Sequence, residues 1–143
     1  MTAKEYLSQI KNLELKINSY LSEIERLQAL ATKTTGIIKN DRVQASVEQQ
    51  KMENAVVKLV DYKLEVSDDM ERCVALKEKI SGEINDVENP TYRYILTERY
   101  VRGESFERIA VGLNYSYRHT TRYHGAALSA FGKKHKDVLE CPM

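Results

Sequence analysis

Residues 89–131 read NPTYRYILTERYVRGESFERIAVGLNYSYRHTTRYHGAALSAF. Capping residues and a glycine divide this stretch into three short helical segments. Asn89 with Pro90 begins the first segment, Gly103 ends it, and Ser105 and Ser116 each precede a new apolar period. The predicted helices are 91–102, 106–113 and 117 to about 131. We therefore expect a short helix, a tight turn of about three residues and a longer helix, packed on a preceding helix.

The last of these helices separates into two faces by residue type. The stripe expected to pack inward is Thr120, His124, Ala127, Leu128 and Phe131, and it faces Phe106, Ile109, Ala110 and Leu113 of the helix before. The other stripe is Tyr117, Arg118, Thr121, Arg122 and Gly125. Arginine can form paired hydrogen bonds with guanine, and threonine can contact a base methyl group or a phosphate. Gly125 costs about 1 kcal/mol relative to alanine in mid-helix, which suits a helix that must closely approach another backbone.

Further candidate contacts lie at both ends of this helix. Ser116 and the amides of the first turn suit a phosphate. Lys133 and Lys134, with His135 and Lys136, are expected beyond the helix, where they would add salt-dependent contacts to a DNA backbone. The residues predicted to bind double-stranded DNA are Ser116, Tyr117, Arg118, His119, Thr121, Arg122, Gly125, Lys133 and Lys134.

The amino-terminal part of the chain repeats in sevens. One row is Ala3, Ile10, Ile17, Ile24 and Ala31, and the other is Tyr6, Leu13, Tyr20 and Leu27, widened by Leu7 and Leu21. This 4-3 spacing predicts one helix over residues 2–31. Isoleucine in one row and leucine in the other suit a two-stranded parallel coiled coil, so we expect a homo-oligomer, with a dimer favoured. The alternative is that both rows are covered within one chain.

A second long helix is expected over residues 47–87, after a connection at 32–45 whose polar residues and Gly36 interrupt the period. Its rows are Met52, Leu59, Val66, Cys73, Ile80 and Val87, and Val56, Lys63, Met70, Lys77 and Ile84. Asp68 and Asp69 are assigned to a solvated face. The two long helices predict an antiparallel hairpin. The fold class is thus all-α, with a hairpin or coiled coil at 1–88 and a three-helix domain at 89–143.

Charge and motif content narrow the function classes. Residues 1–90 hold 13 Lys and Arg against 16 Asp and Glu, whereas residues 91–143 hold 9 against 5, together with all three histidines. A basic carboxyl-terminal part is typical of a nucleic-acid-binding end. No phosphate loop, nucleophile motif or zinc spacing is present, so we expect no enzyme activity, no cofactor and no metal site. No run approaches the roughly 18 apolar residues of a membrane span, and we expect a cytoplasmic, nucleoid-associated protein.

The run LTERYVRGESFERIAVGLNYSYRHTTRYHGAALSAF resembles the fourth region of bacterial sigma factors, the helix-turn-helix that reads the −35 promoter element. The matching positions are Leu96, Arg99, Tyr100, Gly103, Ser105, Ile109, Ala110, Leu113, Tyr115, Ser116, Ala127 and Leu128. Arg118 and Thr120 depart from the small and aliphatic residues usual there, which affects the bases read. The whole chain, including its MTAKEYL start, resembles the ArpU-type late-transcription regulators of phages and prophages.

This resemblance implies a sequence-specific DNA-binding regulator of late phage genes, whose long helices would pair subunits or engage a partner such as host RNA polymerase. Because residues 1–88 are heptad helix, no segment for melting a promoter is expected. An alternative is a DNA-packaging protein similar to a small terminase subunit, which would form a ring. A third interpretation is a protein-binding module, which would show no salt-dependent affinity for DNA.

Overall fold

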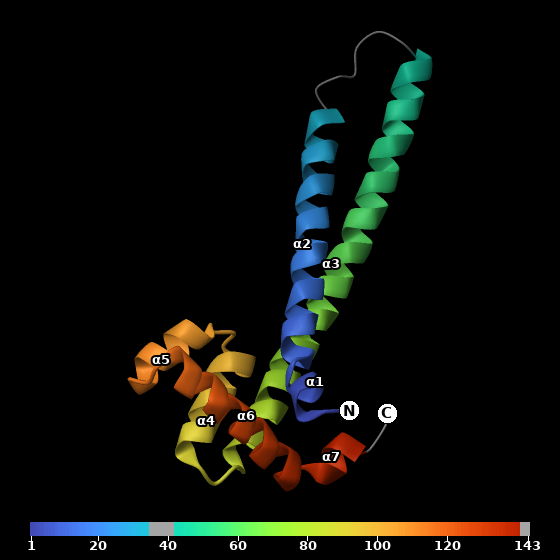
Figure 1. The fold of residues 1–143 in the computed structure, drawn as a ribbon. Coiled ribbons are helices and arrows are strands. Elements are labelled where there is room, and N and C mark those ends of the chain that lie inside the picture. Colours follow the sequence, from blue (N-terminus) through green and yellow to red (C-terminus); the bar gives the residue numbers. More distant parts are fainter. Residues whose placement is uncertain (35–41, 141–143) are drawn as a thin grey trace. The chain divides into compact units, whose positions relative to one another are not determined.

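The computed structural model describes residues 1–34 and 42–140, with side chains given for 1–32 and 46–140 (Figure 1). The described residues are almost entirely helical and contain no strand, which confirms the all-α class. The elements are α1 Ala3–Leu7, α2 Gln9–Thr34, α3 Arg42–Asn85, α4 Pro90–Leu96, the π-helical turn η1 Thr97–Val101, α5 Phe106–Leu113, α6 Tyr117–Lys134 and α7 Lys136–Glu140. None of the helices in these residues is both long and apolar enough to cross a membrane.

The chain divides into two compact units. The first unit combines Met1–Leu13 with Cys73–Met143, and the second is Glu14–Arg72. The units therefore do not follow a division at residue 88. The reason is that the ends of the two long helices supply apolar residues to the core of the short carboxyl-terminal helices.

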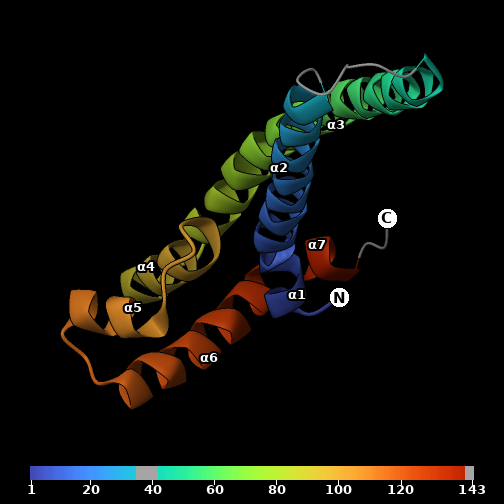
Figure 2. The same ribbon diagram turned by 90° about the horizontal axis from the view of Figure 1, so that it is seen from above.

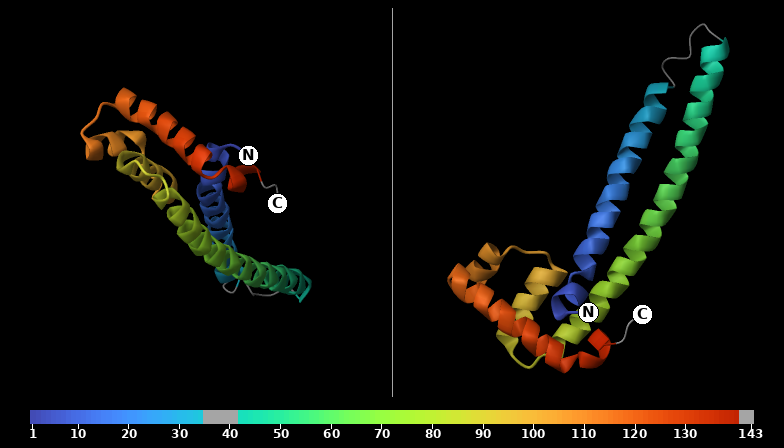
Figure 3. Two further views of the ribbon diagram at one scale, coloured as in Figure 1. Left: turned by 90° about the horizontal axis from the view of Figure 1, so that it is seen from below. Right: turned by 45° about the vertical axis from the view of Figure 1, so that its right-hand side comes forward.

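In the second unit, α2 and α3 lie side by side (Figures 1 and 3). Lys16 Nζ lies 3.1 Å from the Glu65 carboxylate, and the rings of Tyr20 and Tyr62 are 5.3 Å apart. From Lys16 to Tyr20 the residue number on α2 rises, while the number of the contacting residue on α3 falls from Glu65 to Tyr62. The two helices are therefore antiparallel here. The heptad rows of the first segment are confirmed as the inward face, with Ile17, Ile24 and Leu27 all buried. Leu21, expected to widen this stripe, is 41% exposed instead.

The inward face of α3 follows only one of its two expected rows. Val66, Cys73, Ile80 and Val87 are buried, as predicted. The second row is wrong over Val56, Lys63 and Met70, which are exposed, whereas its last member, Ile84, is buried as predicted. The seam uses Tyr62, Asp69 and Leu76 in their place. Each of these residues lies three positions after a residue of the first row, whereas the expected second row lies four positions after it. Lys63 and Lys77 in that expected row are charged, which disfavours its burial.

Asp69 is fully buried, so its assignment to a solvated face is wrong. Lys16 Nζ lies 3.1 Å from Asp69 Oδ2 and donates a hydrogen bond of 3.4 Å to Oδ1. The contact with Oδ2 is ionic rather than a directed hydrogen bond. Arg72 lies 3.6 Å from Oδ1, and hydrogen bonds to Asp69 and Glu65 raise the pKa of Lys16. A buried carboxylate is tolerated here because cationic side chains reach it from both helices.

The ends of the long helices differ from the prediction. The amino-terminal segment is interrupted at Ser8 and continues to Thr34, and α3 begins at Arg42, so the expected connection at 32–45 is too long. Thr32 is still helical, and its hydroxyl donates to the Gln28 carbonyl oxygen at 2.8 Å. The turn-forming residues Gly36, Asn40 and Asp41 lie outside the described residues, as do Ile37 and Ile38, which could dock back onto a helix.

One hydrophobic core holds the first unit together. Its buried members are Tyr6, Leu7, Ile10, Ile80, Ile84, Val87, Leu96, Tyr100, Ala127 and Phe131. The Tyr6 hydroxyl also donates to both oxygens of the Glu83 carboxylate, at 2.6 and 2.8 Å. Within this unit α6 packs along α4 and reaches α1 at its carboxyl-terminal half (Figures 2 and 3). The core thus fixes α6 while leaving one of its faces in solvent.

Candidate nucleic-acid interface

A tight turn joins α5 to α6 (Figure 2). Ser105 caps α5 by accepting from the Arg108 amide at 3.3 Å. Asn114 adopts a left-handed conformation with φ 58°, and the Tyr115 amide donates to the Ala110 carbonyl oxygen at 2.9 Å. Ser116 then caps α6 by accepting from the His119 amide at 3.1 Å. The three residues between the helices and both serine caps are as the sequence predicts, with Asn114 in the role that glycine often fills.

The segment before this pair is less regular than the single helix expected over 91–102. Asn89 caps α4, as predicted, by accepting from the amides of Thr91 and Tyr92. The helix then widens into the π-helical turn η1. Gly103 has φ 73°, and the Glu104 amide donates to the Glu98 carbonyl oxygen at 2.8 Å. This left-handed glycine ends the helix, as the sequence predicts.

The inward face of α6 is the one expected. Thr120, Ala127 and Phe131 are fully buried. The Thr120 hydroxyl donates to the Ser116 carbonyl oxygen at 2.9 Å, which satisfies a polar atom in the core. Thr120 therefore occupies a core position without leaving an unpaired polar group. His124, also expected to pack at this boundary, is half-buried and lies 2.7 Å from the Tyr100 hydroxyl.

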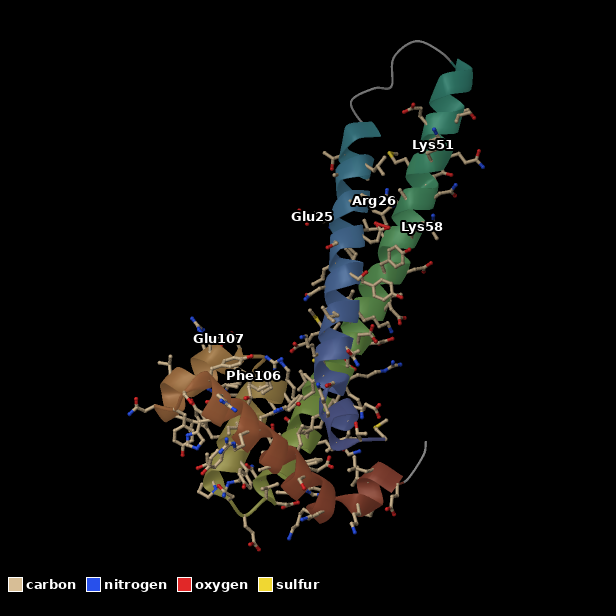
Figure 4. The ribbon with its side chains drawn as sticks, viewed as in Figure 1. Glu25, Arg26, Lys51, Lys58, Phe106 and Glu107 are labelled. Atoms are coloured by element: carbon tan, nitrogen blue, oxygen red, sulfur yellow. The ribbon has the colours of Figure 1, made fainter. Side chains whose placement is uncertain are left out.

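Aromatic contacts fix α6 against the start of α5. The Phe106 ring, labelled in Figure 4, lies 4.9 Å from the His124 ring and 6.3 Å from the Tyr117 ring. The Arg99 guanidinium lies 4.2 Å from the centre of the same Phe106 ring and donates to the Glu104 carbonyl oxygen. Arg99 therefore links η1 to the start of α5 and to the loop before it.

The outward face of α6 carries basic residues in open positions. Arg118 and Arg122 are exposed, and within the described part of the chain neither has an ion-pair partner. The Thr121 hydroxyl donates to the Arg118 carbonyl oxygen at 2.9 Å, so its methyl group is the freer part. A Cβ added at Gly125 would meet no atom within 4 Å. Nothing in the described chain requires a glycine there, so the expected close approach has no partner within the molecule.

The other residues predicted to contact DNA near the start of α6 differ in their exposure. Tyr117 is exposed beside Arg118, and Ser116 sits at the helix start. The His119 ring stacks on Tyr115 at 4.3 Å and meets Tyr123 edge-on at 4.7 Å, so it is half-buried at the border of the face. Ser129 was missed: it is exposed, and the repeat of seven from Arg122 places it on the same face.

Lys133 and Lys134 were expected to lie beyond the end of α6. They form its last turn instead. Lys133 lies eleven residues after Arg122, which rotates it by only about 20°, whereas Lys134 turns about 100° further. Lys133 therefore extends the arginine face and Lys134 does not. His135 is buried, with Nε2 2.7 Å from the Glu83 carbonyl oxygen, so its expected role as an exposed backbone contact is wrong. Lys136 begins α7, a helix that the sequence did not predict.

The charge on α6 has one sign. Its 18 residues include Arg118, Arg122, Lys133 and Lys134 and no Asp or Glu. The amino end of a helix adds partial positive charge, and this end also carries Arg118. A face of this kind attracts anions, and its two arginines lie one turn apart, four residues along the helix. It can bind phosphates and present guanidinium groups to base edges.

A hollow of about 530 Å³ lies on another side of α5. It is lined by Tyr94, Glu98, Glu104, Arg108, Ile109, Val111 and Gly112. Its carboxylates are engaged in ion pairs, Glu98 with Arg102 and Glu104 with Arg108, each at 3.4 Å. The hollow is therefore close to neutral, unlike the outward face of α6. No cluster of three metal-binding side chains occurs among the residues described.

Comparison of the chain with protein-family models, with characterised proteins and with solved structures gave no match.

Proposed function

We propose that the protein is a sequence-specific DNA-binding transcriptional regulator of phage or prophage late genes, and that α6 is its recognition helix. The observation that carries the proposal is the outward face of α6. It combines Arg118, Arg122 and Lys133 with an unobstructed Gly125, on a helix fixed by its opposite face. A capped helix held behind a tight turn is the geometry by which helix-turn-helix proteins enter a major groove.

Each predicted residue has a separate role in this proposal. Arg118 and Arg122 read base edges, and the Thr121 methyl group contacts a thymine. Ser116 and the first amides of α6 lie beside one phosphate, and Lys133 reaches another further along the backbone. Gly125 permits the helix backbone to approach the DNA. Tyr117 borders the face and can contact sugar or phosphate, as can His119 and Lys134.

The proposed mechanism is recruitment, because the long helices over residues 1–88 leave no promoter-melting segment within that range. Tyr94, Ile109 and the 82% exposed Val111 lie around the hollow beside α5, on a surface separate from the DNA face. Host RNA polymerase is the proposed partner there. The protein acts in the cytoplasm on the bacterial nucleoid, and as a homodimer.

The experiment that tests the function is selection of bound fragments from the parent genome, followed by affinity measurements at several salt concentrations. We expect enrichment of a short site near late-gene promoters and affinity that falls steeply with salt. No enrichment together with salt-independent affinity would reject DNA binding and favour a protein-binding module. Enrichment near packaging genes, with a ring of many subunits by light scattering, would favour the alternative, a small terminase-like packaging protein.

A further inference from the structure

The outer face of α3 in the second unit carries an apolar stripe. Val57 is 60% exposed, Val60 is 51% exposed and Leu64 is 62% exposed. Their 3-4 spacing places them on one side of the helix, opposite the buried Val66 and Asp69 that pack toward α2. Val56, 45% exposed, borders the same stripe. Four large aliphatic side chains exposed within nine residues of one helix face are more than a solvated helix needs.

The charges beside the stripe have opposite sign on its two sides. With Val57 and Leu64 in heptad position a and Val60 in position d, Lys63 is in position g and Asp68 is in the following position e. Both side chains are exposed. In a parallel pair of helices, position g of one helix contacts position e of the next heptad on the other. Lys63 of each copy would therefore meet Asp68 of the other.

We propose that a second copy of this chain packs in parallel along the Val57–Val60–Leu64 stripe, with two Lys63–Asp68 ion pairs between the copies. The homodimer of the proposed function would thus form through the outer face of α3, and this inference rests on that function. The heptad rows first expected to join subunits are covered within the chain, as the burial of Ile17, Ile24 and Leu27 shows. An antiparallel pair would bring g positions together and would not match Lys63 with Asp68.

The stripe is short, because Glu53 occupies the core position before it, and Ser67 and Glu71 occupy the two core positions after it. Carboxylates facing each other at these positions limit the pairing to about two heptads. The dimer is therefore expected to dissociate on dilution, and DNA that binds both copies is expected to stabilise it. A parallel pair has twofold symmetry, which suits a site made of two similar half-sites.

The test measures the dimer dissociation constant of the full chain by sedimentation or light scattering over a range of concentrations. Val60→Asp with Leu64→Asp should weaken the dimer by more than about a hundredfold, because two charges per copy replace buried aliphatic contacts. Leu15→Asp is the matched control, since Leu15 is 57% exposed on α2, and it should leave the constant unchanged. Circular dichroism checks that each variant stays helical.

A charge exchange tests the parallel register. Lys63→Asp or Asp68→Lys alone should weaken the dimer about threefold, because surface ion pairs are individually small. The combined variant should recover the wild-type constant. A monomer at every concentration, a dimer unaffected by the stripe variants, or no recovery in the combined variant would each overturn the proposal. DNA affinity separates the two ideas: a monomer that binds the selected site rejects only the dimer, whereas a stripe-dependent dimer without DNA affinity rejects the function.

Discussion

The Tyr100 hydroxyl lies 2.7 Å from Nε2 of His124, joining η1 to the middle of α6. The two rings are also stacked, with their centres 5.7 Å apart. Burial, together with the positive charges of Arg99 and Lys4, lowers the pKa of His124 to about 4. His124 is therefore neutral at physiological pH, and protonating it within the folded protein would place a charge in a half-buried position.

Stability is expected to fall as the pH is lowered from about 6.5 to about 4. The pKa of His124 in the folded protein lies below the ordinary histidine value of 6.5, so the unfolded chain binds the proton more readily in this range. The stabilisation that comes from keeping His124 neutral is complete above pH 6.5, and it is lost as the pH falls toward 4. Thermal melts of the wild type and His124→Gln measure it, with His119→Gln as the control from the same helix. An equally steep dependence in His124→Gln would contradict the assignment.

Removing Lys16 should destabilise the hairpin more than removing Asp69. Lys16→Met leaves the fully buried Asp69 carboxylate with only the weaker Arg72 contact at 3.6 Å. Asp69→Leu leaves Lys16 in contact with water and Glu65, so its cost is smaller. Melting temperatures should rank Asp69→Leu above Lys16→Met, and the double variant should regain most of the loss. The reverse ranking would show that the carboxylate needs no cation from α2.

The capping residues made much of the fold predictable from sequence. Asn89, Ser105 and Ser116 each accept amide hydrogen bonds at the expected helix start, and Gly103 has the expected positive φ. These signals are local, because each depends on residues only two or three positions away. The two faces of α6 were likewise predictable from its 3.6-residue period.

Features that depend on contacts between distant residues were missed. Asp69 occupies a core position that its residue type argues against, and only the position of Lys16 on a separate helix explains it. The burial of His135 depends on the Glu83 carbonyl oxygen, and the choice between two possible rows on α3 depends on α2.

Gly125→Ala is expected to separate stability from DNA binding. A Cβ at this position meets nothing, so helix propensity should stabilise the protein by about 1 kcal/mol. The same methyl group would hold the helix away from a DNA backbone and lower the affinity. Gly82→Ala is the matched control, because Gly82 is exposed on α3 with equal space around it. It should raise the melting temperature without changing DNA affinity. Unchanged affinity in Gly125→Ala would remove the close approach from the proposal.

The most direct test is the affinity of the selected DNA site for Arg118→Ala with Arg122→Ala, measured by fluorescence anisotropy at several salt concentrations. We expect a loss of about 1–3 kcal/mol for each arginine that reads a base, with a shallower salt dependence if either also neutralises a phosphate. Lys51→Ala with Lys58→Ala makes the same change in net charge on α3 (Figure 4) and should have little effect. If the arginine variant binds as tightly as the wild type, the outward face of α6 is not the DNA-binding surface.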